Sequence, residues 1–400
     1  MDPAIDISFE MSQFFQLIPK MQIGILATPG GLELAKKIDR RLIEQRLSLQ
    51  NKIPELKKLP NFIQNTFIID STNPRFNNGE GKARIHETVR GYDLYFIADV
   101  NNWGISYTRN NSVVAMAPDE HFQDLKRLIA ASRGLGARMN VIMPLLYESR
   151  QHKINGRESL DCAIALQELV NMGVQNIMTI DAHNAHVQNA IPGHAFENLH
   201  ANYQMIKALI NSESDFKVGP ENLIIVSPDL GGLERCRYYA EQLQAELTAF
   251  YKLRDMTKVI NGRTPIIEHK FLGGHIRNKI ALVVDDMIAS GDSVLEVAKA
   301  VKRMGARKTY ISCSFSLFTE GISRFNAAYK KGLFNAVFST NATYIPPDLA
   351  AAPWFKQVDI SRLIALYIDA FNRNESVGKL LDNSMKIRRL LIERGLLPNE

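Results

Sequence analysis

The sequence predicts an α/β protein made of two similar domains, each built on a mostly parallel sheet flanked by helices. Short runs rich in β-branched residues alternate with amphipathic helical stretches, which is the pattern of parallel sheets covered by helices. Segments rich in glycine and polar residues follow several of these runs, in the first half of the chain and again in the second. The 400 residues leave room for two to three domains of about 150 residues each.

Four strand-like runs define the predicted sheets, and each of them ends in a polar or glycine-rich loop. They lie at residues 22–27, 140–143, 222–226 and 280–284. A helical stretch follows the first run at residues 32–47, and another follows the last run at residues 294–304. Ligands of open α/β sheets bind beyond the carboxyl ends of the strands, so we expect binding residues in these loops.

The division between the two domains is expected near residues 200–207. We expect the first domain at residues 20–203 and the second at residues 204–345. Residues 346–400 are expected to form a C-terminal segment that packs back and adds a helix. Residues 47–60 and 101–119 look like irregular insertions. Residues 252–274 are rich in Gly, Lys and Arg and lie between two strand-like runs, which favours a flap that closes over an active site.

Composition and charge exclude several classes of protein. Hydrophobic residues make up 46% of the chain and charged residues 22%, which is typical of a globular protein and excludes a disordered one. No uninterrupted apolar run approaches about 18 residues, so we expect no membrane span. A net charge of +6 is mild for this length, and the densest basic stretch, residues 386–394, has the apolar spacing of a surface helix. We therefore expect no nucleic-acid partner.

The cysteines and the N-terminal segment favour a cytoplasmic protein. Cys162, Cys236 and Cys313 lie far apart without the spacing of metal ligands, as expected for reduced thiols. Residues 1–20 carry acidic side chains and lack the basic and apolar regions of a signal peptide.

Two adjacent acids at the end of the fourth strand-like run carry the first chemical signal. Asp285 and Asp286 directly follow the apolar residues of this run. Carboxylates at a strand end can bind sugar hydroxyls or Mg²⁺, because both seek hard oxygen partners. The sequence therefore predicts a polar binding site at this edge of the second sheet.

The loop that follows these acids has the features of a phosphate site. Residues 290–293 lie at the start of a predicted helix, where free backbone N–H groups attract an anion. Gly291 lets the backbone approach a ligand closely, and Ser290 and Ser293 add hydroxyl donors. The alternative is an ordinary strand–helix turn in which Ser293 caps the helix, and the two preceding acids favour the phosphate site.

Residues 283–293 resemble the phosphoribosyl-diphosphate loop of the type I phosphoribosyltransferase fold. Further segments, in the same order along the chain, resemble the ribose-phosphate pyrophosphokinase family. They are residues 76–80 with 89–91, 147–151, 179–183, 227–232 and 251–254. The resemblance covers roughly residues 22–381, with insertions, and implies two similar phosphoribosyltransferase-like domains.

The resemblance implies a reaction and its partners. In this family the anomeric hydroxyl of ribose 5-phosphate attacks the β-phosphorus of ATP, which expels AMP and forms phosphoribosyl diphosphate (PRPP). Such a transfer depends on positioning and charge neutralisation rather than on covalent catalysis. The expected partners are ATP, ribose 5-phosphate, Mg²⁺ and further copies of this chain. A homo-oligomer, a hexamer or its constituent dimers, is implied because the family's adenine site is shared between subunits.

The resemblance also assigns residues to the nucleotide. Phe76, Asn78 and Glu80 match residues that hold adenine, usually from a neighbouring subunit. Arg150 and Gln151 match residues that contact ATP from the other side. For Phe76, packing in the core is the alternative interpretation.

The remaining assignments concern the metal, the flap and the second substrate. His183 and Asp229 match the positions where the family holds Mg²⁺ near the ATP phosphates. Lys252 and Arg254 match the flap cations that stabilise the transferred diphosphate and are the expected catalytic residues. The expected contacts to ribose 5-phosphate are Asp229, Asp285, Asp286, Ser290, Gly291, Asp292 and Ser293.

Two positions of the phosphoribosyl loop depart from the family pattern. Ala289 stands where most members carry an acid, and Asp292 stands where they carry a glycine. The negative charge of Asp292 lies beside the expected 5-phosphate, which is electrostatically unfavourable. This side chain can point outward and cap the helix or pair with a nearby cation, and the sequence leaves both open.

Three other functions compete with PRPP synthesis. A regulatory paralogue without activity would tend to lose the flap cations or the metal histidine, but Lys252, Arg254 and His183 are all present. A diphosphokinase for a larger derivative of ribose 5-phosphate remains open, because Ala289 and Asp292 lie where such a change would act. A plain phosphoribosyltransferase is least favoured, since it would not explain the adenine-loop and flap segments.

Overall fold

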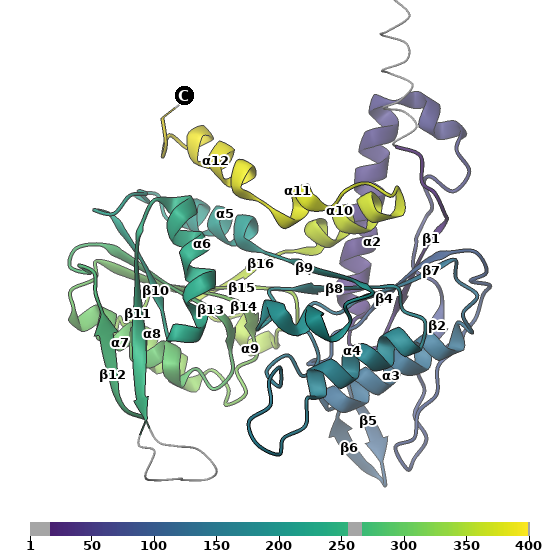
Figure 1. Ribbon diagram of the computed structural model, residues 1–400, viewed down its shortest axis with the longest axis horizontal. Helices are drawn as coiled ribbons and strands as arrows, with labels where there is room; N and C mark the ends of the chain where they lie inside the picture. The colour runs from purple at the N-terminus through teal and green to yellow at the C-terminus, as the bar shows by residue number, and fades with distance from the viewer. Residues whose placement is uncertain (1–16, 255–265, 399–400) are drawn as a thin grey trace, which may run out of the picture. The chain divides into compact units, whose positions relative to one another are not determined.

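The computed structural model describes residues 17–254 and 266–398, and the chain forms two compact units (Figure 1). Unit 1 contains the described residues up to His200, together with residues 342–344 and 360–382. Unit 2 contains residues 201–341, 345–359 and the described residues from 383 onward. The segment expected as one C-terminal piece, residues 346–400, is thus divided between both units. Each unit has its own sheet and its own core, as expected for two α/β domains.

Unit 1 contains a five-stranded sheet in which every strand pair is parallel. In sheet order, its strands are β1 (Ile23–Ala27), β4 (Asp93–Ile97), β7 (Arg138–Ile142), β8 (Asn176–Ile180) and β9 (Ala195–Leu199). Two short antiparallel pairs stand apart from it, β2 (Ser71–Thr72) with β3 (Arg84–Ile85) and β5 (Ser106–Arg109) with β6 (Ser112–Ala115). Strands β4 and β8 are buried along their whole length, as expected for parallel strands covered on both faces.

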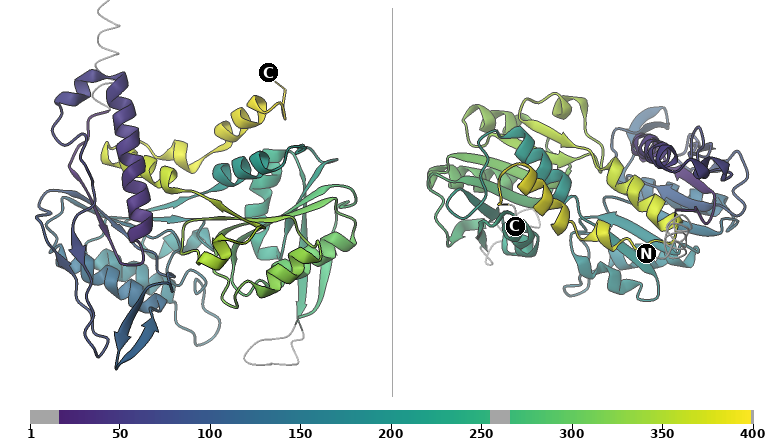
Figure 2. Two further views of the ribbon diagram at one scale, coloured as in Figure 1. Left: turned by 180° about the vertical axis from the view of Figure 1, so that it is seen from behind. Right: turned by 90° about the horizontal axis from the view of Figure 1, so that it is seen from above.

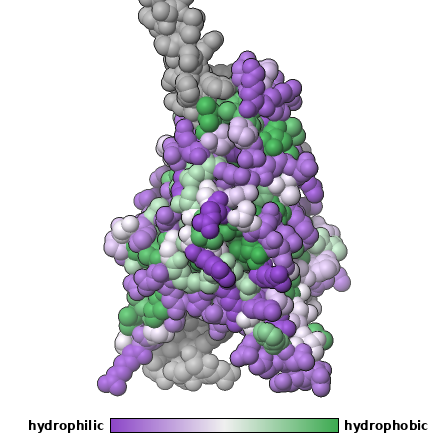
Figure 3. All heavy atoms as spheres, turned by 90° about the vertical axis from the view of Figure 1, so that its right-hand side faces the viewer, coloured by the Kyte–Doolittle hydropathy of each residue, from purple (hydrophilic) through white to green (hydrophobic). Residues whose placement is uncertain are grey.

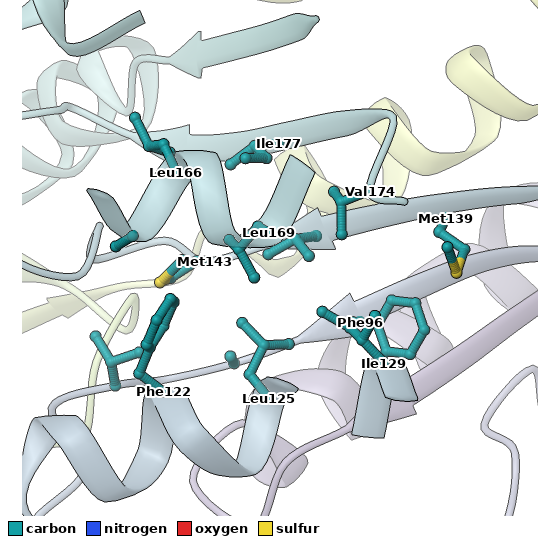
Figure 4. Packing of buried hydrophobic residues seen from close by; sticks show 14 of the residues in the cluster. Phe96, Phe122, Leu125, Ile129, Met139, Met143, Leu166, Leu169, Val174 and Ile177 are labelled. Carbon is teal, nitrogen blue, oxygen red and sulfur yellow. The ribbon is translucent and has the colours of Figure 1, made fainter. Parts of the chain in front are cut away.

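The helices of unit 1 bury one apolar face each. They are α2 (Leu32–Lys52), α3 (Pro118–Ala131), α4 (Asp161–Asn171), α10 (Ser361–Asn372) and α11 (Gly378–Leu381), with 3₁₀ helices η1 (Pro54–Lys58) and η2 (Ala185–Ala190). Figure 4 shows Phe96 of β4 in one cluster with Leu125 and Ile129 of α3 and Leu169 of α4. This apolar burial is the main stabilising contribution to the unit.

A buried ion pair joins helix α10 to α2, which lie side by side in Figures 1 and 2. The Arg46 guanidinium donates through Nε to Asp369 Oδ1 at 3.0 Å, and both side chains are 1% exposed. The Arg46 guanidinium also lies over the rings of Phe62 and Phe67, at 5.3 and 5.1 Å from their centroids. Residues more than 300 positions apart in the chain are thereby held in one unit.

Replacing Asp369 with alanine is expected to lower the free energy of unfolding by about 3–5 kcal/mol, because it leaves the Arg46 charge buried and unpaired. Urea unfolding followed by circular dichroism measures this loss. The control is Glu33→Ala, which removes an exposed pair with Lys36 and is expected to cost less than about 1 kcal/mol. Equal losses in the two variants would contradict a structural role for the buried pair.

Unit 2 contains a seven-stranded sheet that is parallel except at one edge. In sheet order, its strands are β12 (Ile266–Leu272), β11 (Glu246–Arg254), β10 (Leu223–Ser227), β13 (Ile280–Ile288), β14 (Lys308–Ser316), β15 (Ala336–Thr340) and β16 (Phe355–Val358). Its helices are α5 (Asn202–Ser212), α6 (Leu233–Leu243), α7 (Asp292–Arg303), α8 (Ser323–Lys330), α9 (Pro347–Ala350) and α12 (Ser384–Glu393), with the 3₁₀ helix η3 (Leu230–Gly232). Its core includes the fully buried Trp354, which contacts the rings of Phe325 and Phe334.

The two expected insertions are regular structure, so the prediction of irregular segments was wrong. Helix α2 continues to Lys52, because no proline or glycine interrupts it before Pro54 forces the preceding residue out of the helical region. Residues 106–115 form the β5–β6 hairpin, whose turn residues Asn110 and Asn111 have φ values of +48° and +63°. Asparagine tolerates these values, and a two-residue turn of this kind matches the twist of the strands it joins.

The expected flap begins as a β-hairpin. Strands β11 and β12 pair antiparallel, with Tyr251 opposite Lys270. Residues 255–265, which connect them, lie outside the described residues, as do the side chains of residues 252–254 and 266–270.

The described helices and one face of the surface show how apolar residues are distributed. Among the described residues, no helix is both long and apolar enough to cross a bilayer. On the face shown in Figure 3, hydrophilic residues predominate and hydrophobic residues occur in separate patches. The three cysteines are buried and are not joined in disulfides.

Candidate functional site

The carboxyl ends of three neighbouring strands in unit 2 bring the expected ribose 5-phosphate and flap residues to one edge of the sheet. Val226 of β10 pairs with Val283 of β13, so Asp229 and the acid pair after residue 284 both follow at that edge. Strand β11 lies on the other side of β10 and runs parallel to it, with Ala249 opposite Ser227. Strand β11 extends beyond this register, so the backbone of Lys252, opposite His269 of β12, lies past the carboxyl end of β10 at this same edge.

The loop between β13 and α7 depends on glycine. Gly291 is the N-cap of α7 with φ +83°, in the left-handed region that favours glycine. A Cβ atom added at Gly291 would lie 2.3 Å from Cε2 of Phe325. Helix α7 begins at Asp292, and its N-cap residue provides no side-chain cap, so the first-turn N–H groups can take an anion. Ser293 lies inside the first turn rather than at the N-cap position.

Asp292 is paired with a cation, which decides between the two possibilities left open by the sequence. Its Oδ1 accepts a hydrogen bond from Nη2 of Arg324 in α8, and its Oδ2 accepts one from the Ser290 hydroxyl at 2.9 Å. The pair is about half exposed. Arg324 thus partly neutralises the negative charge at the helix N-terminus.

The acid pair lies inside β13, which continues to Ile288, rather than after the strand as expected from the sequence, and it has an unusual electrostatic environment. Burial and the neighbouring Asp286 charge raise the pKa of Asp285 well above its ordinary value. Oδ1 of Asp285 accepts a hydrogen bond from the Asp286 amide at 2.9 Å. The nearly buried Asp286 has Nη1 of Arg235 in α6 at 3.8 Å from its Oδ1. Sequence reasoning missed Arg235, because nothing in its local pattern indicates that α6 brings it to this acid.

Asp229 is held at the end of β10 by local hydrogen bonds. Its Oδ1 accepts from the Gly232 amide at 3.2 Å, and its carbonyl oxygen accepts from the Ser227 hydroxyl at 2.6 Å. The side chain therefore caps the short helix η3. This arrangement holds a carboxylate beside the strand that carries the acid pair.

In unit 1, the loops after β7 and β8 emerge next to one another, because these strands pair in parallel with Ile142 opposite Met178. The loop after β8 carries His183, which is exposed and whose ring centroid lies 5.4 Å from that of His152. Sequence reasoning missed His152, although it comes only two residues after Arg150. This edge of the sheet thus presents two imidazoles and an exposed guanidinium.

Gln151 and Asp181 serve local structure in these loops. The Gln151 side-chain amide donates to the Ser159 carbonyl at 2.9 Å, which closes the loop before α4. Asp181 has φ +43°, and its Oδ1 lies 2.7 Å from Nδ1 of His200. These contacts fix the loop backbones that carry Arg150 and His183.

The segment with Phe76, Asn78 and Glu80 forms a compact turn on the surface of unit 1. The amide of Phe76 donates to the Glu80 carbonyl at 2.7 Å. The Asn78 amide side chain donates to Glu80 Oε2 at 2.9 Å. Phe76 is 52% exposed, which excludes the core-packing interpretation within this chain. A turn that carries an exposed aromatic ring, a carboxylate and an amide is suited to a flat, polar-edged ligand such as a nucleobase.

The expected metal residues lie in different units, His183 in unit 1 and Asp229 in unit 2. Among the described residues, no group of three or more His, Cys, Asp and Glu side chains is placed to hold a metal ion. Mg²⁺ commonly uses one or two protein ligands and takes the rest from water and substrate phosphates. A sparse donor set is therefore compatible with an ion that arrives with a phosphorylated substrate.

Comparison with known proteins identifies the family. Residues 23–173 match the model of the N-terminal domain of ribose phosphate pyrophosphokinase, and residues 251–382 match that of the phosphoribosyl synthetase-associated domain. The chain belongs to the ribose-phosphate pyrophosphokinase family. It is therefore an enzyme of the transferase class, as the sequence resemblance implies.

Individual relatives of this ribose-phosphate pyrophosphokinase family member match most of its length. The ribose-phosphate pyrophosphokinase of Chlorobaculum tepidum is 26% identical over 335 residues, which cover 82% of this chain and 93% of the relative. That of Synechococcus elongatus is 28% identical over 312 residues, which cover 76% and 84%. The crystal structure of phosphoribosylpyrophosphate synthetase from Mycobacterium smegmatis matches with a TM-score of 0.68 at 19% identity and covers 88% of this chain and 99% of its own. The structural match confirms the predicted α/β fold of two phosphoribosyltransferase-like domains.

Proposed function

We propose that this enzyme transfers the diphosphate of ATP to the anomeric hydroxyl of ribose 5-phosphate and forms PRPP and AMP. The observation that carries the proposal is that β13 holds two acids near its carboxyl end and that the loop after it leads to a glycine-dependent helix N-terminus. A helix N-terminus suits the 5-phosphate, and the acids suit the ribose hydroxyls. This combination occurs in a chain whose family carries the name of the reaction.

The two units take separate roles in the proposal. Unit 1 is the ATP side, with Arg150, Gln151 and His183 in its strand-end loops. Unit 2 is the ribose 5-phosphate side, where Asp286 and Asp285 hold the ribose and the amides after Gly291 hold the 5-phosphate. The remaining contacts proposed for ribose 5-phosphate are Asp229, Ser290, Asp292 and Ser293. Through its pairing with Arg324, Asp292 keeps its charge partly neutralised beside the phosphate.

The transfer itself is proposed to use positioning and positive charge. The anomeric O–H bond breaks and its proton passes to water, while its oxygen forms a bond to the β-phosphorus of ATP and the bond from that phosphorus to the α–β bridging oxygen breaks to release AMP. Lys252 and Arg254 stabilise the negative charge that spreads over the transferred diphosphate. His183 and Asp229 are the residues that would hold Mg²⁺, and the ion would supply further charge neutralisation to the ATP phosphates.

We also propose a cytoplasmic homo-oligomer. Phe76 is exposed on the surface of its own unit, which is suited to an adenine site completed by a neighbouring subunit, as in a hexamer or its constituent dimers. The buried cysteines, which are not joined in disulfides, agree with a reducing compartment.

A diphosphokinase for a larger ribose 5-phosphate derivative is the second candidate. The observation in its favour is Ala289, a small residue where the family carries an acid, with its backbone carbonyl engaged by the Thr319 amide at 3.0 Å. AMP release measured with ribose 5-phosphate and with derivatives extended at the sugar separates the two. A higher kcat/KM with ribose 5-phosphate supports PRPP synthesis. A higher kcat/KM with an extended acceptor would contradict PRPP synthesis and support the second candidate.

Replacing Phe76 with alanine is expected to raise KM for ATP by roughly tenfold or more, because base–aromatic stacking contributes about 1–3 kcal/mol per base. KM for ribose 5-phosphate should stay unchanged. Ile164→Ala, a similarly exposed residue of α4, is the matched control and should leave both constants unchanged. Steady-state kinetics with each substrate varied in turn gives the answer, and an unaltered KM for ATP in Phe76→Ala would remove Phe76 from the adenine site.

A further inference from the structure

Backbone contacts within the loop of residues 75–81 close it, but its orientation on unit 1 depends on contacts with other elements. The Gly79 amide donates to the Phe76 carbonyl at 2.8 Å. The backbones of Arg75 and Gly81 form an antiparallel β-bridge across the loop. Gly79 has φ +96°, which permits the tight reversal. These bonds fix the shape of the loop, whereas its orientation on unit 1 must come from neighbouring elements.

Arg75 ties the loop to helix α3. Its guanidinium donates to Asp124 Oδ2 at 2.7 Å and to the Glu120 carbonyl at 3.3 Å, and its other terminal nitrogen donates to the Gly79 carbonyl at 3.4 Å. The side chains of Arg75 and Asp124 are 8% and 1% exposed. Hydrogen bonds between buried charges are strong and directional, so this pair is a rigid link between the loop and α3.

The β5–β6 hairpin holds the same loop from the other side. At its tip, the Asn110 amide donates to the Asn77 carbonyl at 3.0 Å. A Cβ atom added at Gly79 would lie 3.0 Å from Cδ of Arg109 and 3.4 Å from the Tyr107 hydroxyl, so both side chains border the loop. The hairpin therefore contacts the loop through its backbone and through two side chains.

Tyr107 connects the two supports. Its hydroxyl donates to Glu120 Oε1, and its ring lies under the Arg75 guanidinium, 5.3 Å from centroid to Cζ. Glu120 also accepts, through Oε2, from the Ala117 amide at 3.0 Å at the start of α3. One aromatic side chain thus joins the hairpin, the loop arginine and the first turn of α3.

The hairpin contributes little to the core of unit 1. Both of its strands are largely exposed, and Val113 on β6 is 77% exposed. An isolated two-stranded hairpin is marginal in water, so its order depends on the contacts at its tip and at Tyr107. These contacts are made with the loop that carries Phe76, Asn78 and Glu80 and with its support α3.

We propose that the β5–β6 hairpin and Arg75 position the 76–80 loop for nucleotide binding, with Arg75 and Tyr107 as positioning residues. The inference rests on the proposed function, because that function assigns the loop to ATP. It gives the segment of residues 101–119 a role in nucleotide affinity. A supporting contact acts by holding a binding group in its productive geometry, and its loss appears as weaker binding rather than as slower chemistry.

The test uses Arg75→Met, Tyr107→Ala and Tyr107→Phe in the full chain. ATP affinity is measured by titration calorimetry, both KM values by kinetics, and amide exchange of residues 76–80 by mass spectrometry. We expect Arg75→Met and Tyr107→Ala to weaken ATP binding roughly tenfold and to speed exchange in the loop, with KM for ribose 5-phosphate unchanged. Tyr107→Phe keeps the ring under Arg75 and should give a smaller, few-fold effect. Val113→Ser, on the exposed side of β6, is the matched control and should change none of these quantities.

The outcomes separate this inference from the proposed function. Normal ATP affinity in Arg75→Met and Tyr107→Ala, with only a lower melting temperature, would overturn the positioning role and leave PRPP synthesis intact. If Arg75→Met does not fold, the two Tyr107 variants decide alone. Wild-type protein that binds ATP without forming PRPP contradicts the proposed function, while the affinity series still decides the positioning role. Wild-type protein that does not bind ATP overturns both.

Discussion

Replacing Lys252 with alanine is expected to lower kcat by roughly 10²–10³-fold, because a cation that acts on the transferred diphosphate stabilises the transition state more than the bound substrates. The backbone of Lys252 lies three residues beyond Ala249 on β11, whose partner β10 leads directly to Asp229. The KM values should change little. Steady-state kinetics on the purified variant gives kcat and both KM values.

The control for this variant is Lys299→Ala, which removes an exposed lysine from α7 and is expected to leave kcat unchanged. Both variants should unfold at the wild-type temperature. If kcat of Lys252→Ala is within about threefold of the wild-type value, the loss is well below that expected for a transition-state contact. This result would remove Lys252 from the mechanism.

Replacing Gly291 with alanine is expected to abolish measurable binding of ribose 5-phosphate. The residue has φ +83°, which costs an L-residue roughly 1–2 kcal/mol, and the added Cβ would lie 2.3 Å from the Phe325 ring. Since Phe325 is fully buried against Trp354, the loop must move rather than the ring. The first-turn amides of α7 then lose their positions around the phosphate.

Calorimetric titration with ribose 5-phosphate and then with ATP tests this variant. We expect ATP binding to persist, because the proposed nucleotide residues belong to unit 1. The matched control is Gly332→Ala, a positive-φ glycine of the same unit with open space around its Cβ position, which should retain ribose 5-phosphate binding. Wild-type affinity for ribose 5-phosphate in Gly291→Ala would show that this loop is not the phosphate site.

Much of the fold could be predicted because its signals are local. The four strand-like runs correspond to β1, β7, β10 and β13, since buried parallel strands are continuous apolar runs. The errors came where a local signal was overlooked. Asn110–Asn111 is a two-residue turn signal, and the absence of Pro and Gly before Pro54 allows α2 to continue.

The site could be predicted only in part, for a physical reason. The acids of β13 and the loop proposed to hold the phosphate are adjacent in sequence, so their spacing alone predicted an anion site. The packing of helices and hairpins brings three further side chains to their partners, and no local sequence pattern encodes these contacts. They are Arg235, Arg324 and Tyr107. The pairing of Asp292 was undecidable for this reason, because its partner follows 32 residues later on another helix.

The measurement that tests the central claim most directly is phosphorus NMR of the purified protein with ATP, ribose 5-phosphate and Mg²⁺. We expect AMP and PRPP to appear in equal amounts, with no ADP, because the β–γ diphosphate moves as one group. Label placed at the β-phosphorus of ATP should reach the phosphorus bonded to the anomeric oxygen of PRPP. Formation of ADP with ribose 1,5-bisphosphate, or no product from protein that binds both substrates, would contradict the proposed reaction.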